Sequence, residues 1–140
     1  MNNLYCLLIG ILITLMTTFN GILSENIGNY TSTVIVHLVG LLSTIFVMLF
    51  SKRKIIFNKN IPLYLYSAGA IGVLTVLFNN ISFNAVGISL TLSLGLLGQS
   101  LTSMIIDHYG LFGMKINKFN KKKILGFALM TIGIIIMTIY

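Results

Sequence analysis

The chain has 140 residues, of which 56% are hydrophobic and 8% are charged, and its formal net charge is +7. A soluble domain of this length still exposes about a third of its unfolded surface and needs many more charged side chains to cover that surface. The composition excludes a water-soluble globular fold and predicts an all-α protein that crosses a lipid bilayer several times.

Five stretches are apolar and long enough to span a membrane, which takes about 20 residues in a helix. They run from Leu4 to Leu23, Thr31 to Ser51, Ile61 to Asn80, Phe83 to Ile106 and Ile124 to Tyr140. We predict one transmembrane domain over residues 1–140, with a polar turn at residues 24–29. The connection at residues 79–84 is so short that the third and fourth helices are predicted to form an antiparallel hairpin.

Every basic side chain lies in one of two predicted loops. The first loop holds Lys52, Arg53, Lys54 and Lys59, and the second holds Lys115, Lys118, Lys121, Lys122 and Lys123. With five helices both loops lie on the same side, so the positive-inside rule places them and the N-terminus in the cytoplasm and the C-terminus outside. Basic residues that only flank apolar runs also argue against a nucleic-acid partner.

Small residues recur at helical spacing in three of the predicted helices. They are Gly10, Thr14, Thr17, Thr18 and Gly21 in the first, Gly87, Thr91, Gly95, Gly98 and Thr102 in the fourth, and Gly126 and Gly133 in the fifth. Such residues let a neighbouring helix approach closely. Packing within the chain is the simpler interpretation, and contact with another subunit is the alternative.

Polar residues inside the predicted spans are the candidates for function. Gln99, Ser103 and Asp107 are spaced i, i+4, i+8 and so lie on one face of the fourth helix. An unpaired carboxamide in lipid costs several kcal/mol, so Gln99 either holds helices together or lines a substrate path. Asn20 and His37 pose the same choice. Asp107 and His108 close the fourth helix at the cytoplasmic edge, as gating residues or as interfacial residues that pair with nearby lysines.

The chain lacks the residues that most catalytic sites need. It has only two acidic residues and two histidines, too few for a cluster of metal ligands, a catalytic triad or a pair of catalytic carboxylates. Cys6 is its only cysteine, so no disulfide forms within the chain. We therefore expect no enzymatic activity, no cofactor and no metal centre.

The segment from Leu97 to Gly113 carries a distinctive motif, LGQSLTSMIIDHYGLFG. It joins a Gly-Gln pair to an Asp-His-aromatic-Gly-Leu-Phe-Gly turn, which a basic loop and a last apolar helix follow. This pattern resembles the YdcZ-type five-helix family of bacterial membrane proteins, a branch of the drug/metabolite transporter superfamily. The resemblance covers essentially the whole chain and implies a bundle of two inverted units around a central pathway in the inner membrane. It also implies that Asn20, Gln99, Ser103 and Asp107 occupy recurrent polar positions.

These observations together predict a subunit of a transporter for a small metabolite or drug-like compound, which works by alternating access. Five helices cannot contain two copies of an inverted repeat, so the second half must be another chain. Nine basic residues in two loops and none elsewhere favour a homologous partner of opposite orientation, in a heterodimer, over an antiparallel homodimer. A non-transporting accessory subunit and a small ion channel remain the alternatives, and the substrate stays open.

Overall fold

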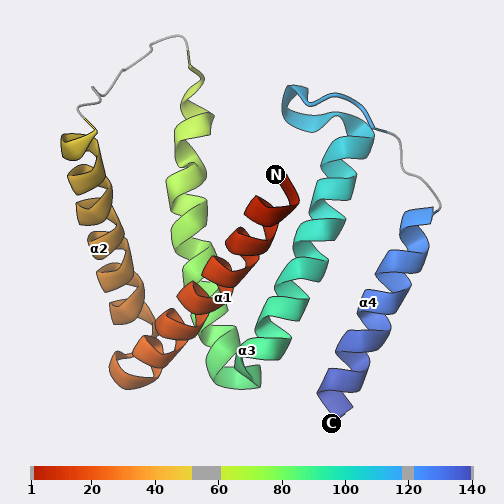
Figure 1. The fold of residues 1–140 in the computed structure, drawn as a ribbon, viewed down its shortest axis with the longest axis horizontal. Helices are drawn as coiled ribbons and strands as arrows, with labels where there is room; N and C mark the ends of the chain where they lie inside the picture. Colours follow the sequence, from red (N-terminus) through yellow and green to blue (C-terminus); the bar gives the residue numbers. More distant parts are fainter. Residues whose placement is uncertain (1, 52–60, 118–121, 140) are drawn as a thin grey trace. The chain divides into compact units, whose positions relative to one another are not determined.

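The computed structural model describes residues 2–51, 61–117 and 122–139. Regular structure in these ranges is helical throughout (Figure 1). The elements are α1 (Asn2–Ile27), α2 (Asn29–Phe50), the 3-10 helix η1 (Leu63–Ser67), α3 (Ala68–Tyr109), the 3-10 helix η2 (Leu111–Gly113) and α4 (Lys122–Ile139). They form two compact units, Met1–Ala85 and Val86–Tyr140, and each is described by itself.

The connection between α1 and α2 is a single residue, Gly28. Its φ of 86° and ψ of 153° fall where glycine is favoured. The Gly28 N–H donates to the carbonyl of Ser24 at 2.9 Å, and the Gly28 carbonyl accepts from the N–H of Ser32 at 3.1 Å. The predicted turn at residues 24–29 is therefore wrong in extent, because α1 continues through Ile27 and α2 begins at Asn29.

Helix α3 covers both the third and the fourth predicted helices, and its one internal break lies at Gly87. There φ is 77° and ψ is 175°, outside helical geometry, and this glycine separates two helical parts. Residues 79–84, predicted to be a connection, are helical, so that prediction is wrong by several residues. Two asparagines of this segment, Asn80 and Asn84, form hydrogen bonds with other helices.

Three long segments in the described ranges are apolar and long enough to cross a membrane. They are Asn3–Ile27, Asn29–Phe50 and Leu63–Tyr109, of 25, 22 and 47 residues, and Ile124–Ile139 is a shorter apolar helix. A span takes about 20 residues, so the third segment is long enough for two. The all-helical fold and these lengths agree with a membrane protein.

Burial in this fold is inverted relative to a soluble protein. Among the described residues no hydrophobic side chain is buried, whereas seven polar ones are: Thr17, Asn20, Ser24, Ser32, Thr33, Asn80 and Thr91. Water would strongly disfavour so much exposed apolar surface, while lipid solvates it and leaves polar side chains to find partners inside. The distribution identifies lipid as the surrounding solvent.

Close helix packing occurs at Gly21, one of the small residues predicted to allow it in the first helix. A Cβ at Gly10, Gly95, Gly126 or Gly133 would meet no atom within 4 Å, and the same holds for Gly98. A Cβ at Gly21 would overlap the Phe83 ring, because α1 and the first part of α3 lie close together there. Contact between the other glycines and a second subunit stays a prediction.

We expect Gly21→Ala to destabilise the first unit by about 1–3 kcal/mol, since an added methyl group must displace the Phe83 ring. The matched control is Gly10→Ala on the same helix, where the methyl group meets nothing and alanine favours the helix. Thermal unfolding in detergent should show a lower Tm for the first variant and an unchanged or higher Tm for the second. Equal Tm values for both would contradict the close contact.

Candidate functional site

An amide–hydroxyl cluster joins α1, α2 and the first part of α3 near the Gly28 turn. We use this name for Ser24, Asn29, Ser32, Thr33, Asn80 and Asn84. Helix α1 supplies the first residue, α2 the next three and α3 the last two. Asn80 and Asn84 are one helical turn apart, so their side chains project from one face of α3.

Asn80 is the centre of the cluster and is fully buried, with 0% of its surface exposed. Its Nδ2 donates to Ser32 Oγ at 3.1 Å and to Thr33 Oγ1 at 3.5 Å. Both hydroxyls in turn donate to the backbone carbonyl of Asn29, at 3.0 and 2.7 Å. Both hydroxyls already donate their hydrogen to the Asn29 carbonyl, so they can only accept a hydrogen bond from Asn80. The amide nitrogen of Asn80 therefore faces α2, and its amide oxygen points away from that helix.

Asn84 ties all three helices together one turn further along. Its Nδ2 donates to Asn29 Oδ1 on α2 at 3.0 Å, and its Oδ1 accepts from Ser24 Oγ on α1 at 3.4 Å. The same Ser24 hydroxyl donates to the Gly21 carbonyl at 2.7 Å, so its link to Asn84 is the weaker of the two. Interhelical hydrogen bonds of this kind stabilise packing in lipid, where apolar burial supplies little.

Three buried polar side chains of the first unit have groups without a hydrogen-bond partner among the described residues. Asn80 Oδ1 and Thr17 Oγ1 are fully enclosed and make no hydrogen bond to a described residue. Asn20, which is 8% exposed, makes no hydrogen bond to a described residue through its carboxamide. Buried groups of this type are rare and call for an explanation, such as a bound water, an ion or a ligand.

His37 lies on α2 one turn beyond Thr33 and is half-buried. Its Nδ1 is 2.8 Å from the Thr33 carbonyl and donates to it in the tautomer that carries the proton there. The ring borders an otherwise apolar groove of about 300 Å³ that Thr33, Val34, His37, Leu38, Leu41 and Val73 line. The structure thus places Asn20 and His37 in the same unit as the amide–hydroxyl cluster, on different helices.

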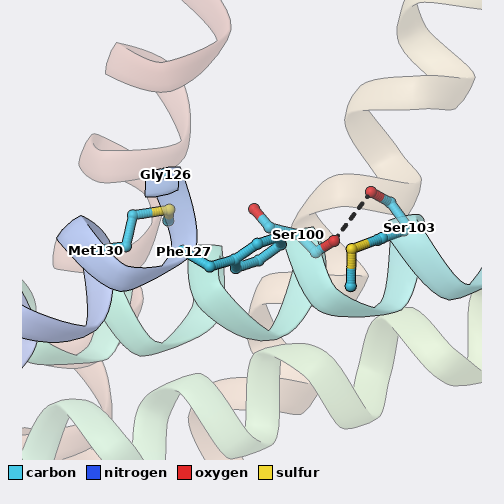
Figure 2. A pocket seen from close by; sticks show the side chains of 6 residues that line it. Ser100, Ser103, Gly126, Phe127 and Met130 are labelled. Atoms are coloured by element: carbon cyan, nitrogen blue, oxygen red, sulfur yellow. Dashed lines mark hydrogen bonds between the residues drawn. The ribbon is translucent and has the colours of Figure 1, made fainter. Parts of the chain in front are cut away.

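The second unit contains Gln99 and Ser103, and both side chains are exposed in the single chain. Ser103 borders a groove of about 340 Å³ between α3 and α4, together with Ser100, Met104, Gly126, Phe127 and Met130. Figure 2 shows the Phe127 ring reaching from α4 toward Ser100, and the Ser103 hydroxyl bonded to the Ser100 carbonyl at 3.3 Å. Gln99 does not border this groove, so its place in an assembled interior stays a prediction.

The motif after Gln99 ends in a tightly wound turn. Gly110 and Gly113 have positive φ angles of 61° and 77°, and Phe112, at 58°, is the only described residue other than glycine with one. The Asp107 carbonyl accepts from the Asn117 N–H at 2.8 Å, and the His108 and Tyr109 rings meet edge to face at 5.0 Å. The side chains of the lysines predicted to pair with Asp107 lie outside the described residues, except that of Lys115.

The sequence interpretation missed the amide–hydroxyl cluster. One signal could have revealed it: Asn80 and Asn84 are a helical turn apart in a segment that lacks glycine and proline from residue 79 to residue 84. Their partners on α2, Ser32 and Thr33, are ordinary hydroxyl residues in an apolar run. Nothing in their spacing identifies them as partners of residues 47 and 48 positions away.

Comparison with known families gives one match, and it covers nearly the whole chain. The family described as "Putative inner membrane exporter, YdcZ" matches residues 2–136. No curated protein and no solved structure matches the chain. The match includes the amide–hydroxyl cluster, the break at Gly87 and the Gln99 segment.

Proposed function

We propose, since the chain belongs to the YdcZ family, that it is one subunit of a small-molecule transporter and works by alternating access with an inverted partner chain. The family is transporter-like rather than enzymatic, which supports this assignment. The substrate is a small metabolite or a drug-like compound. A non-transporting accessory subunit is the main alternative, and in that case the buried polar side chains only hold helices together.

The observation that carries the proposal is the inverted burial. Seven polar side chains are buried in helices whose described hydrophobic side chains are not, and some of the buried polar atoms have no partner. A subunit that needed only to hold its helices together would gain by satisfying or replacing those atoms, because each unsatisfied group costs about 1–3 kcal/mol. Polar residues that contact a solute during part of a transport cycle do not need a permanent hydrogen-bond partner within the protein.

Two features support five membrane spans and one orientation. The 47-residue segment Leu63–Tyr109 is long enough for two spans and is interrupted at Gly87. With five spans, all nine basic residues fall on one side, which puts the N-terminus in the cytoplasm and the C-terminus outside. The odd number of spans then requires a second, inverted chain to complete the pathway.

Flux into liposomes tests the proposal directly. The chain would be reconstituted alone and with a homologous chain of opposite charge bias, and offered cationic, neutral and anionic solutes. Saturable uptake of one solute by the pair supports a transporter. Absence of flux for every solute with a correctly assembled pair favours the accessory subunit, and unsaturable ion conductance favours a channel.

We expect Gln99→Leu to lower flux roughly tenfold, the effect of losing about 1.4 kcal/mol of substrate binding. Folding should change little, because Gln99 is exposed in the single chain. The matched control is Asn26→Leu, which removes an exposed amide whose only hydrogen bond to a described residue is with the Ile22 carbonyl on the same helix. Flux and thermal aggregation are measured on the same preparations. Parallel loss of both in Gln99→Leu would mean that Gln99 holds helices together.

A further inference from the structure

The unpartnered polar groups of the first unit point to a ligand. Thr17 is the most informative of them, because the other two buried threonines satisfy themselves within their own helix. Thr33 and Thr91 each donate to the carbonyl four residues earlier, both at 2.7 Å. Thr17 is 2% exposed and makes no such bond, so its hydroxyl is held away from its helix backbone.

Thr17, Asn20 and Asn80 converge on one level of the first unit. Thr17 and Asn20 lie on the face of α1 that continues to Gly21 and Ser24, and those two residues contact Phe83 and Asn84 of α3. Both helices run toward the Gly28 turn (Figure 1). The residues one helical turn before these contacts therefore lie at a similar position along the helix axes. They are Thr17 and Asn20 on α1 and Asn80 on α3.

The chemistry of these groups favours a cation. Asn80 offers only its oxygen, because its nitrogen is bonded to α2. Thr17 adds a hydroxyl oxygen and Asn20 a carboxamide oxygen, and neither is bonded to a described residue.

We propose that Thr17, Asn20 and Asn80 form a binding site for a monovalent cation, Na⁺ or K⁺, held by neutral oxygens. A divalent ion would require carboxylate ligands, and the chain's two acidic residues, Glu25 and Asp107, are not among these groups. Use of this ion to drive transport rests on the proposed function, whereas its binding does not.

Thermal unfolding of the purified full chain tests the site without any transport assay. NaCl or KCl is titrated against choline chloride at constant ionic strength. Wild type is expected to show a Tm that rises with Na⁺ or K⁺ and saturates. Thr17→Val, which keeps the shape and loses the oxygen, should raise the apparent Kd at least tenfold. Thr17→Ser should retain the wild-type dependence.

The matched control is Thr18→Val, which alters the neighbouring threonine whose hydroxyl already bonds the Thr14 carbonyl at 2.8 Å. This variant should keep the wild-type Kd. A second measurement on wild type, broadening of the ²³Na resonance reversed by K⁺, checks direct binding. Absence of any cation dependence in wild type would overturn the site and leave bound water as the occupant. Equal Kd values in Thr17→Val and wild type would also overturn it. Cation-dependent Tm with cation-independent flux would keep the site and remove only its role in transport.

Discussion

Replacing Asn80 by leucine is expected to lower the free energy of unfolding by about 2 kcal/mol and to loosen α3 from α2. The variant loses both hydrogen bonds that Asn80 donates to α2. Bonds of this kind contribute about 0.6 kcal/mol on average in membrane proteins, and up to about 1.7. Two such bonds, both donated by one fully buried amide, contribute about 1–3 kcal/mol together, and the expected loss lies in the middle of that range. Unfolding in lipid bicelles, followed by a probe on α2, measures it.

Asn79→Leu is the matched control, because it makes the same change at the adjacent residue. Asn79 is half-buried and makes no hydrogen bond to a described residue, so its replacement should leave the free energy of unfolding within about 0.5 kcal/mol of wild type. A double-mutant cycle of Asn80→Leu with Thr33→Val should give a coupling energy of at least about 0.5 kcal/mol. Additive effects, or equal losses in the two asparagine variants, would show that the amide bonds do not hold α3 to α2.

The chain expressed alone should insert in one orientation only, with a C-terminal reporter outside. Inverting it would carry nine basic residues to the outer face. Against an inside-negative potential this costs about 2.3 kcal/mol per charge per 100 mV, on the order of 20 kcal/mol in all. A pair of reporters, one active only inside and one only outside, measures the ratio of the two orientations.

The control for orientation keeps the charge and changes the side chain. Lysine-to-arginine replacement at residues 52, 54 and 59 should leave the reporter ratio unchanged, while replacement of the same lysines by serine should lower it. Insertion of the wild-type chain in both orientations, together with a stable antiparallel homodimer, would refute the heterodimer. If the chain inserts in a single orientation and the cell contains no homologous partner, only a parallel assembly is possible. Such an assembly is incompatible with the proposed alternating-access mechanism.

Composition predicted the parts of this structure that depend on solvent. The apolar runs form helices of lengths suited to a lipid bilayer. The reason is that backbone N–H and C=O groups in the hydrocarbon core must form hydrogen bonds with one another, as they do in a helix. Prediction failed where a residue's role depends on a distant helix. Asparagine usually favours turns, yet Asn80 and Asn84 lie within α3 because hydroxyl and amide partners on α1 and α2 satisfy their side chains.

The position of the break in α3 was also not predictable from the local sequence. Gly87 was available in the sequence as a flexible residue, but glycine is also common inside membrane helices, where it allows close packing. Gly95 and Gly98, further along α3, have helical geometry, and only Gly87 among the three leaves it. For the candidate site, Asn20 is buried within the first unit, whereas Gln99 is exposed within the second.

The buried residues of the first unit lie near one end of its helices. A small tilt at that packed end therefore moves the opposite end much further. All of its buried residues lie toward the Gly28 turn, and the described remainder of α2 beyond His37 has none. Helix α2 has 22 residues, so at 1.5 Å per residue its arm is about 33 Å long. A tilt of about 10° at the tied end sweeps the free end through about 5 Å. A tilt too small to break the hydrogen bonds near the Gly28 turn thereby moves the far end of α2 by several ångströms, a distance that would suit the proposed passage of a small solute.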